Sequence, residues 1–329
     1  MADELDGIAA ATAFSGVVRA DRDGQVLLER AYGFAHRGLR APITPATRFG
    51  IASGTKGLTA LAVMSLVEDG TLALGTTARS LLGDDLPLID DAVTVEHLLA
   101  HRSGIGDYVD EDALESATEH VLPVPVHELD TTEAYLRVLG GFPQAFPPGA
   151  RFAYNNGGYV VLALLAERAA GVPFDVLVHA RVCAPAGMRD TAFLRGDEPD
   201  GDVALGYLEA TGLRTNVLHL PVRGSGDGGI VSTAADVHAF WRALFAGRIV
   251  APARVREMVA PRSDAGEMRY GLGFWLAPRD GAATLVGSDA GISFYSVHDP
   301  ERGTTGTVLA NTTEGAWPVG DALERILGD

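Results

Sequence analysis

The sequence predicts an α+β protein in which strands from both ends of the chain form one antiparallel sheet. Two β-rich runs, 14–20 and 25–33, flank a short segment that ends in Asp23-Gly24. Asp-Gly between such runs is typical of a hairpin turn. Strand-like runs recur in close order over 274–310, with turn residues at 278–281, and close spacing favours antiparallel neighbours. Because an isolated two-stranded hairpin is marginally stable, we expect the first hairpin to join the late strands.

The middle of the chain predicts helices. Helical signals with capping or stop residues nearby occur in three segments, 94–101, 131–139 and 160–170. A last helix covers 319–327, and no Pro/Gly/Ser-rich linker separates independent domains. We therefore expect a discontinuous mixed α/β domain, its sheet flanked by helices, from 1–70 and 225–329, and a mainly helical lobe from 71–224. The site is expected in the cleft between them, a common position for pockets.

Composition and charge restrict the possible partners. The 329 residues include 26 basic and 43 acidic side chains, a net charge of -17. This balance argues against nucleic acid and anionic membranes, because both favour clustered Lys and Arg. The single cysteine, Cys183, leaves no internal disulfide and no multi-cysteine metal site. No basic and apolar leader is seen at the N-terminus, and no run approaches the ~18 apolar residues of a membrane span. These features predict a cytoplasmic protein.

Ser53 and Lys56 stand at the head of an apolar helix. Apolar residues at 58, 61, 62 and 66 have a helical period, and Gly70 follows as a stop signal. The serine hydroxyl and the lysine amine therefore share one helix face. A serine needs a base to become a good nucleophile, and a lysine removed from water can supply a neutral amine. Ser-x-x-Lys alone is a weak signal, because short motifs match by chance.

Tyr154 and Asn156 lie in a loop just ahead of the second apolar helix, which has its own stop at Gly171. A tyrosine hydroxyl near a lysine ammonium releases its proton more readily and can relay it to a leaving group. An asparagine amide can hold the lysine and also donate to a substrate carbonyl. Taken alone, Tyr154 is better explained as a loop aromatic that packs on the helix.

His97 and His101 are one helical turn apart, a spacing that also occurs in zinc sites. Metalloproteases of that kind have a glutamate directly after the first histidine, and this chain has Leu98 there. We therefore interpret both histidines as packed side chains at the end of a helix, and we predict no metal.

The two motifs together resemble the serine β-lactamase and penicillin-binding-protein superfamily. The resemblance is to its class C branch, which includes D-amino-acid peptidases and β-lactamase-fold esterases, and it runs from about Phe14 to the end. Further matching segments are 93–104, 185–191, 226–236 and 270–274. It implies a β-lactamase/transpeptidase-like fold, no cofactor, Ser53 as the acylated nucleophile and Lys56 as its base. It also implies that Tyr154 shuttles the proton and that Asn156 orients Lys56 and the substrate amide.

The third motif departs from the family pattern. The family has Lys-Thr-Gly or His-x-Gly on a strand that lines the pocket, and here Ser288 stands where the cationic residue is expected. Asp289 and Ala290 follow, and Gly291 is expected to supply one oxyanion N–H while Ser53 supplies the other. A serine makes only a neutral hydrogen bond, and Asp289 would repel an anion. We therefore expect uncharged esters, or substrates with an amine near the scissile bond.

The expected function is a serine hydrolase that acts through an acyl-enzyme on Ser53, with a small ester, amide or lactam as substrate. An esterase or a D-amino-acid peptidase or amidase fits best. The same residues also serve an acyltransferase, a β-lactamase or a DD-carboxypeptidase. A non-catalytic binding module on the same scaffold is a further alternative. An α/β-hydrolase is not indicated, because no serine lies in a Gly-x-Ser-x-Gly elbow.

Overall fold

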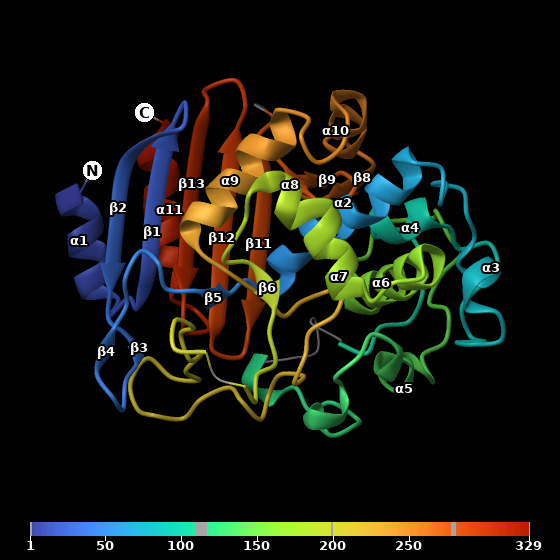
Figure 1. Ribbon diagram of the computed structural model, residues 1–329, viewed down its shortest axis with the longest axis horizontal. Coiled ribbons are helices and arrows are strands. Elements are labelled where there is room, and N and C mark those ends of the chain that lie inside the picture. Colours follow the sequence, from blue (N-terminus) through green and yellow to red (C-terminus); the bar gives the residue numbers. More distant parts are fainter. Residues whose placement is uncertain (1, 110–116, 199, 278–280, 329) are drawn as a thin grey trace.

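One large antiparallel sheet built from both ends of the chain organises the protein. The computed structural model describes residues 2–109, 117–198, 200–277 and 281–328. Within them, eight strands pair in the order β2-β1-β13-β12-β11-β10-β9-β8 (Figure 1). β1 pairs antiparallel with β13, so that Val17 faces Leu309. The prediction that the N-terminal hairpin joins the late strands is confirmed, as is the α+β class.

The strands of this sheet match most of the predicted runs. Their bounds are β1 Gly16–Arg22, β2 Gln25–Tyr32, β8 Ser263–Ala265, β9 Met268–Tyr270, β10 Trp275–Leu276, β11 Ala283–Asp289, β12 Ile292–Asp299 and β13 Thr304–Ala310. The short strands β8 and β9 were not predicted. Most of the turn predicted at 278–281 lies outside the described residues. The smaller pairings use β3 Phe34–His36, β4 Ala41–Pro42, β5 Phe49–Gly50, β6 Ala192–Phe193 and β7 Ile230–Ser232.

Helices cover both faces of the sheet, which explains why neighbouring residues of one strand are both buried. Val18 and Val308 pack against α1 (Ala2–Ala11) and α11 (Ala316–Gly328) on one face. Val17 and Leu309 belong to the main core on the other face, together with α2 (Thr55–Glu68) and α9 (Ala234–Phe245). Figure 1 shows α9 in front of the sheet and α11 behind it. Burial on both faces makes the sheet a rigid support for α2.

The remaining helices lie beside the sheet, mostly between 71 and 224 (Figure 1). They are α3 Ala78–Leu82, α4 Val95–Leu99, α5 Leu136–Leu139, α6 Asn156–Ala170, α7 Phe174–Val178, α8 Ala184–Ala186 and α10 Pro252–Met258. The helix predicted over 131–139 is a 3-10 turn, η5 (Glu133–Tyr135), followed by α5. The division into two domains at 70/71 and 224/225 stays a prediction. Among the described residues, no helix combines the length and apolar character needed to cross a membrane.

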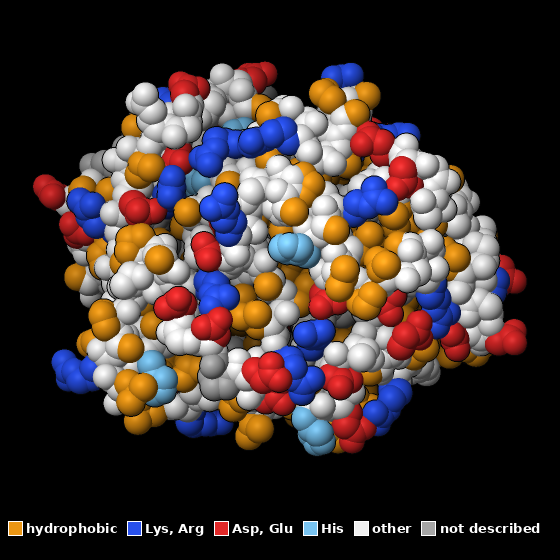
Figure 2. Space-filling model, viewed as in Figure 1, with side chains coloured by type: hydrophobic (Ala, Val, Ile, Leu, Met, Phe, Trp, Pro, Cys, Tyr) orange, Lys and Arg blue, Asp and Glu red, His pale blue; other side chains and the backbone are white. Residues whose placement is uncertain are grey.

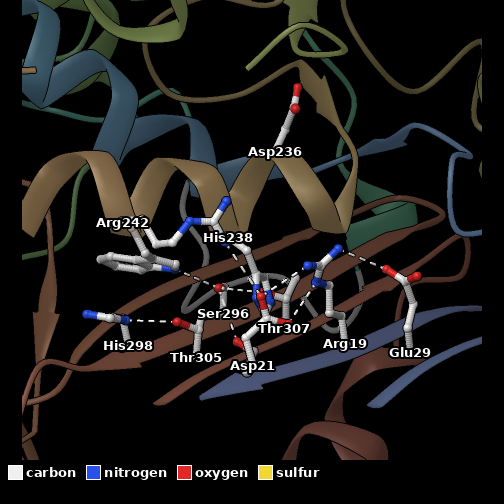
Figure 3. Close-up of polar contacts among 12 residues, drawn as sticks. Arg19, Asp21, Glu29, Asp236, His238, Arg242, Ser296, His298, Thr305 and Thr307 are labelled. Atoms are coloured by element: carbon white, nitrogen blue, oxygen red, sulfur yellow. Dashed lines mark hydrogen bonds and ion pairs between the residues drawn. The ribbon is translucent and has the colours of Figure 1, made fainter. Parts of the chain in front are cut away.

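A buried polar cluster fastens α9 to the sheet (Figure 3). His238 Nδ1 on α9 lies 3.0 Å from Asp21 Oδ2 on β1, and Arg19 Nε donates to Asp21 Oδ1 at 2.9 Å. Burial alone would raise the pKa of Asp21, but the neighbouring His238 and Arg19 outweigh it and hold that pKa well below its usual value. Trp241 on the same helix donates to Ser296 Oγ at 2.8 Å. Removing either Arg19 or Asp21 would leave the charge of the other buried without its partner.

The face in Figure 2 carries charged side chains of both signs. There, Arg side chains lie interspersed with Asp and Glu side chains.

Candidate active site

Ser53 lies in a 3-10 turn, η1 (Ala52–Gly54), that leads directly into α2. Ala52 has φ of 42°, a left-handed conformation that costs energy for alanine. Gly54 packs against the ring of Phe294 on β12 so closely that a Cβ would collide with it. The turn η1 therefore packs tightly against the sheet, which fixes the Ser53 hydroxyl at the start of α2.

Lys56 is buried with its amine beside the serine. The side chain is only 2% exposed. Its Nζ lies 2.9 Å from Ser53 Oγ, 2.8 Å from Asn156 Oδ1 and 2.9 Å from the carbonyl oxygen of Asp227. The structure therefore brings Ser53, Lys56 and Asn156 together, in the arrangement that the two sequence motifs predict.

Tyr154 flanks the same amine. Lys56 Nζ lies 5.0 Å from the centroid of the Tyr154 ring. The ring stacks on Trp275 of β10 with an interplanar angle of 18°, and its centroid is 4.4 Å from that of His101. Packing on two sides limits the movement of the phenol, so Tyr154 is a fixed neighbour of Lys56.

Asn156 is the first residue of α6, and the loop before it is tightly capped. Asn155 is the N-cap, and its side-chain oxygen accepts from Gly158 N at 2.6 Å. Asp107 accepts from the backbone N–H of Asn156 at 2.6 Å and of Gly157 at 2.9 Å. The helix start is therefore satisfied by side chains, which fixes the backbone that carries the Asn156 amide.

The two histidines have packing and capping contacts. His97 Nδ1 accepts from Thr94 N at 3.3 Å in a capping box at the start of α4. His101 Nδ1 accepts from Asn155 N at 3.1 Å. Burial, followed by the charge of Lys56, holds the pKa of His101 well below its usual value. His101 is therefore a neutral side chain behind the Tyr154 loop.

The third motif has a different register from the one expected. Gly287 on β11 packs against η1, and a Cβ there would lie 3.0 Å from Ser53 N and collide with the carbonyl oxygen of Ile51. Ser288 is the next residue, with an exposed side chain. Gly291, the expected oxyanion donor, lies at the hairpin tip, where its N–H donates to Thr313 Oγ1 at 2.9 Å. We therefore correct this expectation, because the strand residue against the nucleophile is Gly287.

Gly287→Ala tests this packing. Because the added methyl group meets backbone atoms, the turn that carries Ser53 must shift, and overpacking of this kind costs about 1–3 kcal/mol. We expect a lower free energy of unfolding in denaturant and a clear loss of Ser53 reactivity. Gly75→Ala, where a Cβ meets nothing within 4 Å, is the matched control. Wild-type stability in Gly287→Ala would contradict the close packing of η1 on β11.

A cavity of about 400 Å³ begins beside the nucleophile. Ala52 and Asp227 line it, whereas Ser53 itself does not. Tyr108 and Asp289 also line it, and the Tyr108 hydroxyl donates to Asp227 Oδ2. Much of the remaining wall is apolar and includes Leu194, Leu205, Val217, Leu218 and Leu220. Asp197, Glu198, Asp200 and Arg195 also line it, so the cavity can receive an apolar group beside side chains whose charges are mostly negative.

Asp107, Tyr108 and Asp227 are site residues that the sequence analysis did not assign. Asp227 lies in the glycine-rich loop of 226–236, whose resemblance to the family was noted without a role for its aspartate. Thr59 Oγ1 on α2 donates to Gly226 O at 2.6 Å, so this loop is tied to the nucleophile helix. The glycine spacing was the only signal that could have pointed to it.

Comparisons with known proteins identify the family of this chain. The sequence model described as Beta-lactamase matches residues 3–328. A penicillin-binding protein structure from Bacillus halodurans is 34% identical, with a TM-score of 0.92 over 98% of this chain and 99% of that chain.

Two curated relatives differ in their named activities. Esterase EstB of Burkholderia gladioli is 36% identical over 54% of this chain and 46% of its own length. A D-aminopeptidase of Brucella anthropi is 29% identical over 79% of this chain and 48% of its own length. The chain thus spans about half the length of these relatives. Since the family match covers almost all of the sequence, the chain belongs to the Beta-lactamase family.

Proposed function

We propose that this protein is a serine hydrolase that forms an acyl-enzyme on Ser53. The observation that carries the proposal is the buried contact of Lys56 Nζ with Ser53 Oγ at 2.9 Å and Asn156 Oδ1 at 2.8 Å. A nucleophile next to a base that a third group orients is the arrangement required for covalent catalysis.

In the proposed reaction, the neutral Lys56 amine takes the hydroxyl proton as Ser53 Oγ attacks the substrate carbonyl. The tetrahedral intermediate collapses when Tyr154 gives its proton to the leaving alcohol or amine and takes back the proton that Lys56 accepted from Ser53. Water then attacks the ester on Ser53 and loses a proton to the neutral Lys56. Tyr154 protonates Ser53 Oγ as the acyl–oxygen bond breaks and recovers that proton from Lys56. The products are a carboxylic acid and free Ser53, so the protons balance over one cycle.

The oxyanion would bind to the backbone N–H groups of Ser53 and Ser288. Asp289 and Ile292 flank a two-residue turn, and the pair next to such a turn is of the hydrogen-bonded type. Pairs alternate along an antiparallel ladder, so Ser288, opposite Ser293, is in a non-hydrogen-bonded pair. Its N–H therefore points away from β12. Ser288 directly follows Gly287, the strand residue packed against Ser53, which supports this choice over Gly291.

Negative charge in the cavity favours substrates that carry an amine. Burial, followed by the charges of Asp227 and Asp289, holds the pKa of Tyr135 well above its usual value, and Tyr135 lines the same cavity. A substrate carboxylate would be repelled there, whereas an ammonium group would be attracted. We infer that aminoacyl esters or amides are preferred to β-lactams, in keeping with the D-aminopeptidase among the relatives.

Asp289→Asn tests this preference. We expect kcat/KM for an aminoacyl aryl ester to fall about tenfold, because one charge-assisted contact is lost. The matched N-acetyl ester, which has no charge, should change little in the same variant. Equal losses for the two substrates would contradict a role of Asp289 in amine selection.

A substrate panel tests the function as a whole. It comprises neutral aryl esters, D- and L-aminoacyl amides and a chromogenic cephalosporin, with Ser53→Ala as the blank. We expect turnover of the esters or aminoacyl amides well above that of the cephalosporin. Equal turnover of the anionic lactam and a neutral ester would contradict the substrate class, and failure of a fluorophosphonate to label Ser53 would favour a non-catalytic binding module.

A further inference from the structure

We propose that Asp107 is a positioning residue, which holds Asn156, and through it Lys56, in the reactive arrangement only while its carboxyl group is ionised. This inference rests on the proposed function, because it concerns the reactivity of Ser53. Asp107 has no described contact with Ser53 or Lys56, so its effect must pass through the backbone of α6.

The first step is the cap on α6. Asp107 Oδ2 accepts from Asn156 N at 2.6 Å and Oδ1 accepts from Gly157 N at 2.9 Å. These are the first two residues of a helix that runs from Asn156 to Ala170. With both oxygens used, the carboxylate fixes the position and the direction of the helix start.

The second step runs from this cap to the nucleophile. The side chain of Asn156 accepts from Lys56 Nζ, which in turn lies within hydrogen-bond distance of Ser53 Oγ. A shift of the Asn156 backbone would therefore move the group that orients the base. Catalytic groups tolerate little displacement, since a misplacement of about 1 Å can cost about 100-fold in rate.

The third step is the ionisation of Asp107. Burial, reinforced by the charge of Asp227 and opposed by the backbone hydrogen bonds, raises the pKa of Asp107 to about 6. A protonated carboxyl group offers an O–H toward backbone N–H donors, so one capping bond is lost. Among the described residues, Asp227 on the glycine-rich loop acts on Asp107, and so does Tyr108, the next residue in the chain. Tyr135 on η5 and His120 lie near Tyr108, and Lys56 lies beyond Asn156.

Protonation of Asp107 should change stability and activity in opposite directions. Its folded pKa of about 6 lies above the ordinary 3.8, so the folded state binds the proton more tightly than the unfolded state does. Its contribution to the free energy of unfolding therefore increases as pH falls between these values. Activity, in contrast, should fall, because the cap weakens. A merely structural role for Asp107 would not produce this divergence.

The test is the pH profile of kcat/KM for a neutral aryl ester between about pH 5 and 8, with melting temperatures recorded alongside. For the wild type we expect an acid limb with a midpoint near 6. Asp107→Asn should remove the component of the limb with this midpoint, leave any limb that belongs to the base Lys56, and lower the plateau about 10- to 100-fold. Asp107→Glu, which keeps a carboxylate, should retain a limb. Asp236→Asn is the matched control and should keep the limb, because Asp236 is also a carboxylate whose pKa is raised by burial, and it accepts from the loop groups Asp190 N and Thr191 Oγ1.

Two results would overturn the proposal. One is a wild-type profile that is flat across this range, a result that needs no variant. The other is an Asp107→Asn enzyme with the rate and acid limb of the wild type. If Asp107→Asn does not fold, loss of the limb in the folded Asp107→Glu variant would also count against it. Failure of the proposed function is distinguishable, since Ser53 of the wild type would then resist fluorophosphonate at every pH.

Discussion

Ser53→Ala is expected to abolish covalent labelling by a fluorophosphonate and to reduce ester turnover to the level of the uncatalysed reaction or slightly above it. The alanine removes the only atom proposed to bond to the substrate, and losses of about a millionfold in kcat are known for serine hydrolase nucleophiles. Intact-protein mass spectrometry after labelling checks the first expectation, and a spectrophotometric ester assay checks the second.

Ser65→Ala provides the control for this change. Ser65 lies on the same helix, is buried, and donates only to Ala62 O among the described contacts. It should therefore label and turn over substrate like the wild type. Labelling of the Ser53→Ala variant at a wild-type rate would show that another residue is the nucleophile.

Lys56→Ala is expected to slow acylation of Ser53 by several orders of magnitude, because nucleophile and base act as a unit. Lys56→Arg separates charge from basicity. Arginine keeps the positive charge but stays protonated at any working pH, so it should be nearly as inactive as alanine. Stopped-flow measurement of ester acylation compares the three enzymes.

The Lys56→Arg variant can contradict the proposed role of Lys56. If it acylated at a rate close to that of the wild type, the positive charge would be sufficient and proton abstraction by Lys56 would be excluded. Circular dichroism must accompany the measurement, since the larger guanidinium would have to fit a side-chain site that is 2% exposed in the native protein.

The sequence predicts the local parts of the site well. Ser53 and Lys56 are three residues apart on one helix, so their contact depends only on helical geometry. Asn156 begins α6 beside its N-cap, a local signal that a sequence also carries. That the starts of α2 and α6 lie close together cannot be predicted from residue spacing. The family resemblance predicted it.

The register of the third motif could not be predicted in the same way. Which strand residue meets the nucleophile depends on the pairing of β11 with β12 and on the packing of η1 against it. If the family's third motif is aligned a few residues further along the strand, the sequence matches it equally well. Gly287 and Gly291 can both take the position of its glycine. Only the contact with Ser53 distinguishes them.

Asp107 and Asp227 were missed for a related reason. Asp107 contacts Asn156, about 50 residues away in the sequence, and Asp227 contacts Lys56, about 170 residues away. Isolated aspartates in loops most often face water.

The short strands β8 and β9 carry too few residues to show an alternating pattern. Such elements become visible only when their partners are in place.

The protonation state of Lys56 tests the central claim most directly. Lys56 is the only lysine in the sequence, so protein grown on lysine labelled with carbon-13 at Cε gives a single side-chain resonance to follow by NMR. We predict that this resonance reports a neutral amine at about pH 8, in the free enzyme with Ser53 unmodified. A resonance that stays at the ammonium position throughout the range in which the enzyme acylates would contradict proton abstraction by this residue.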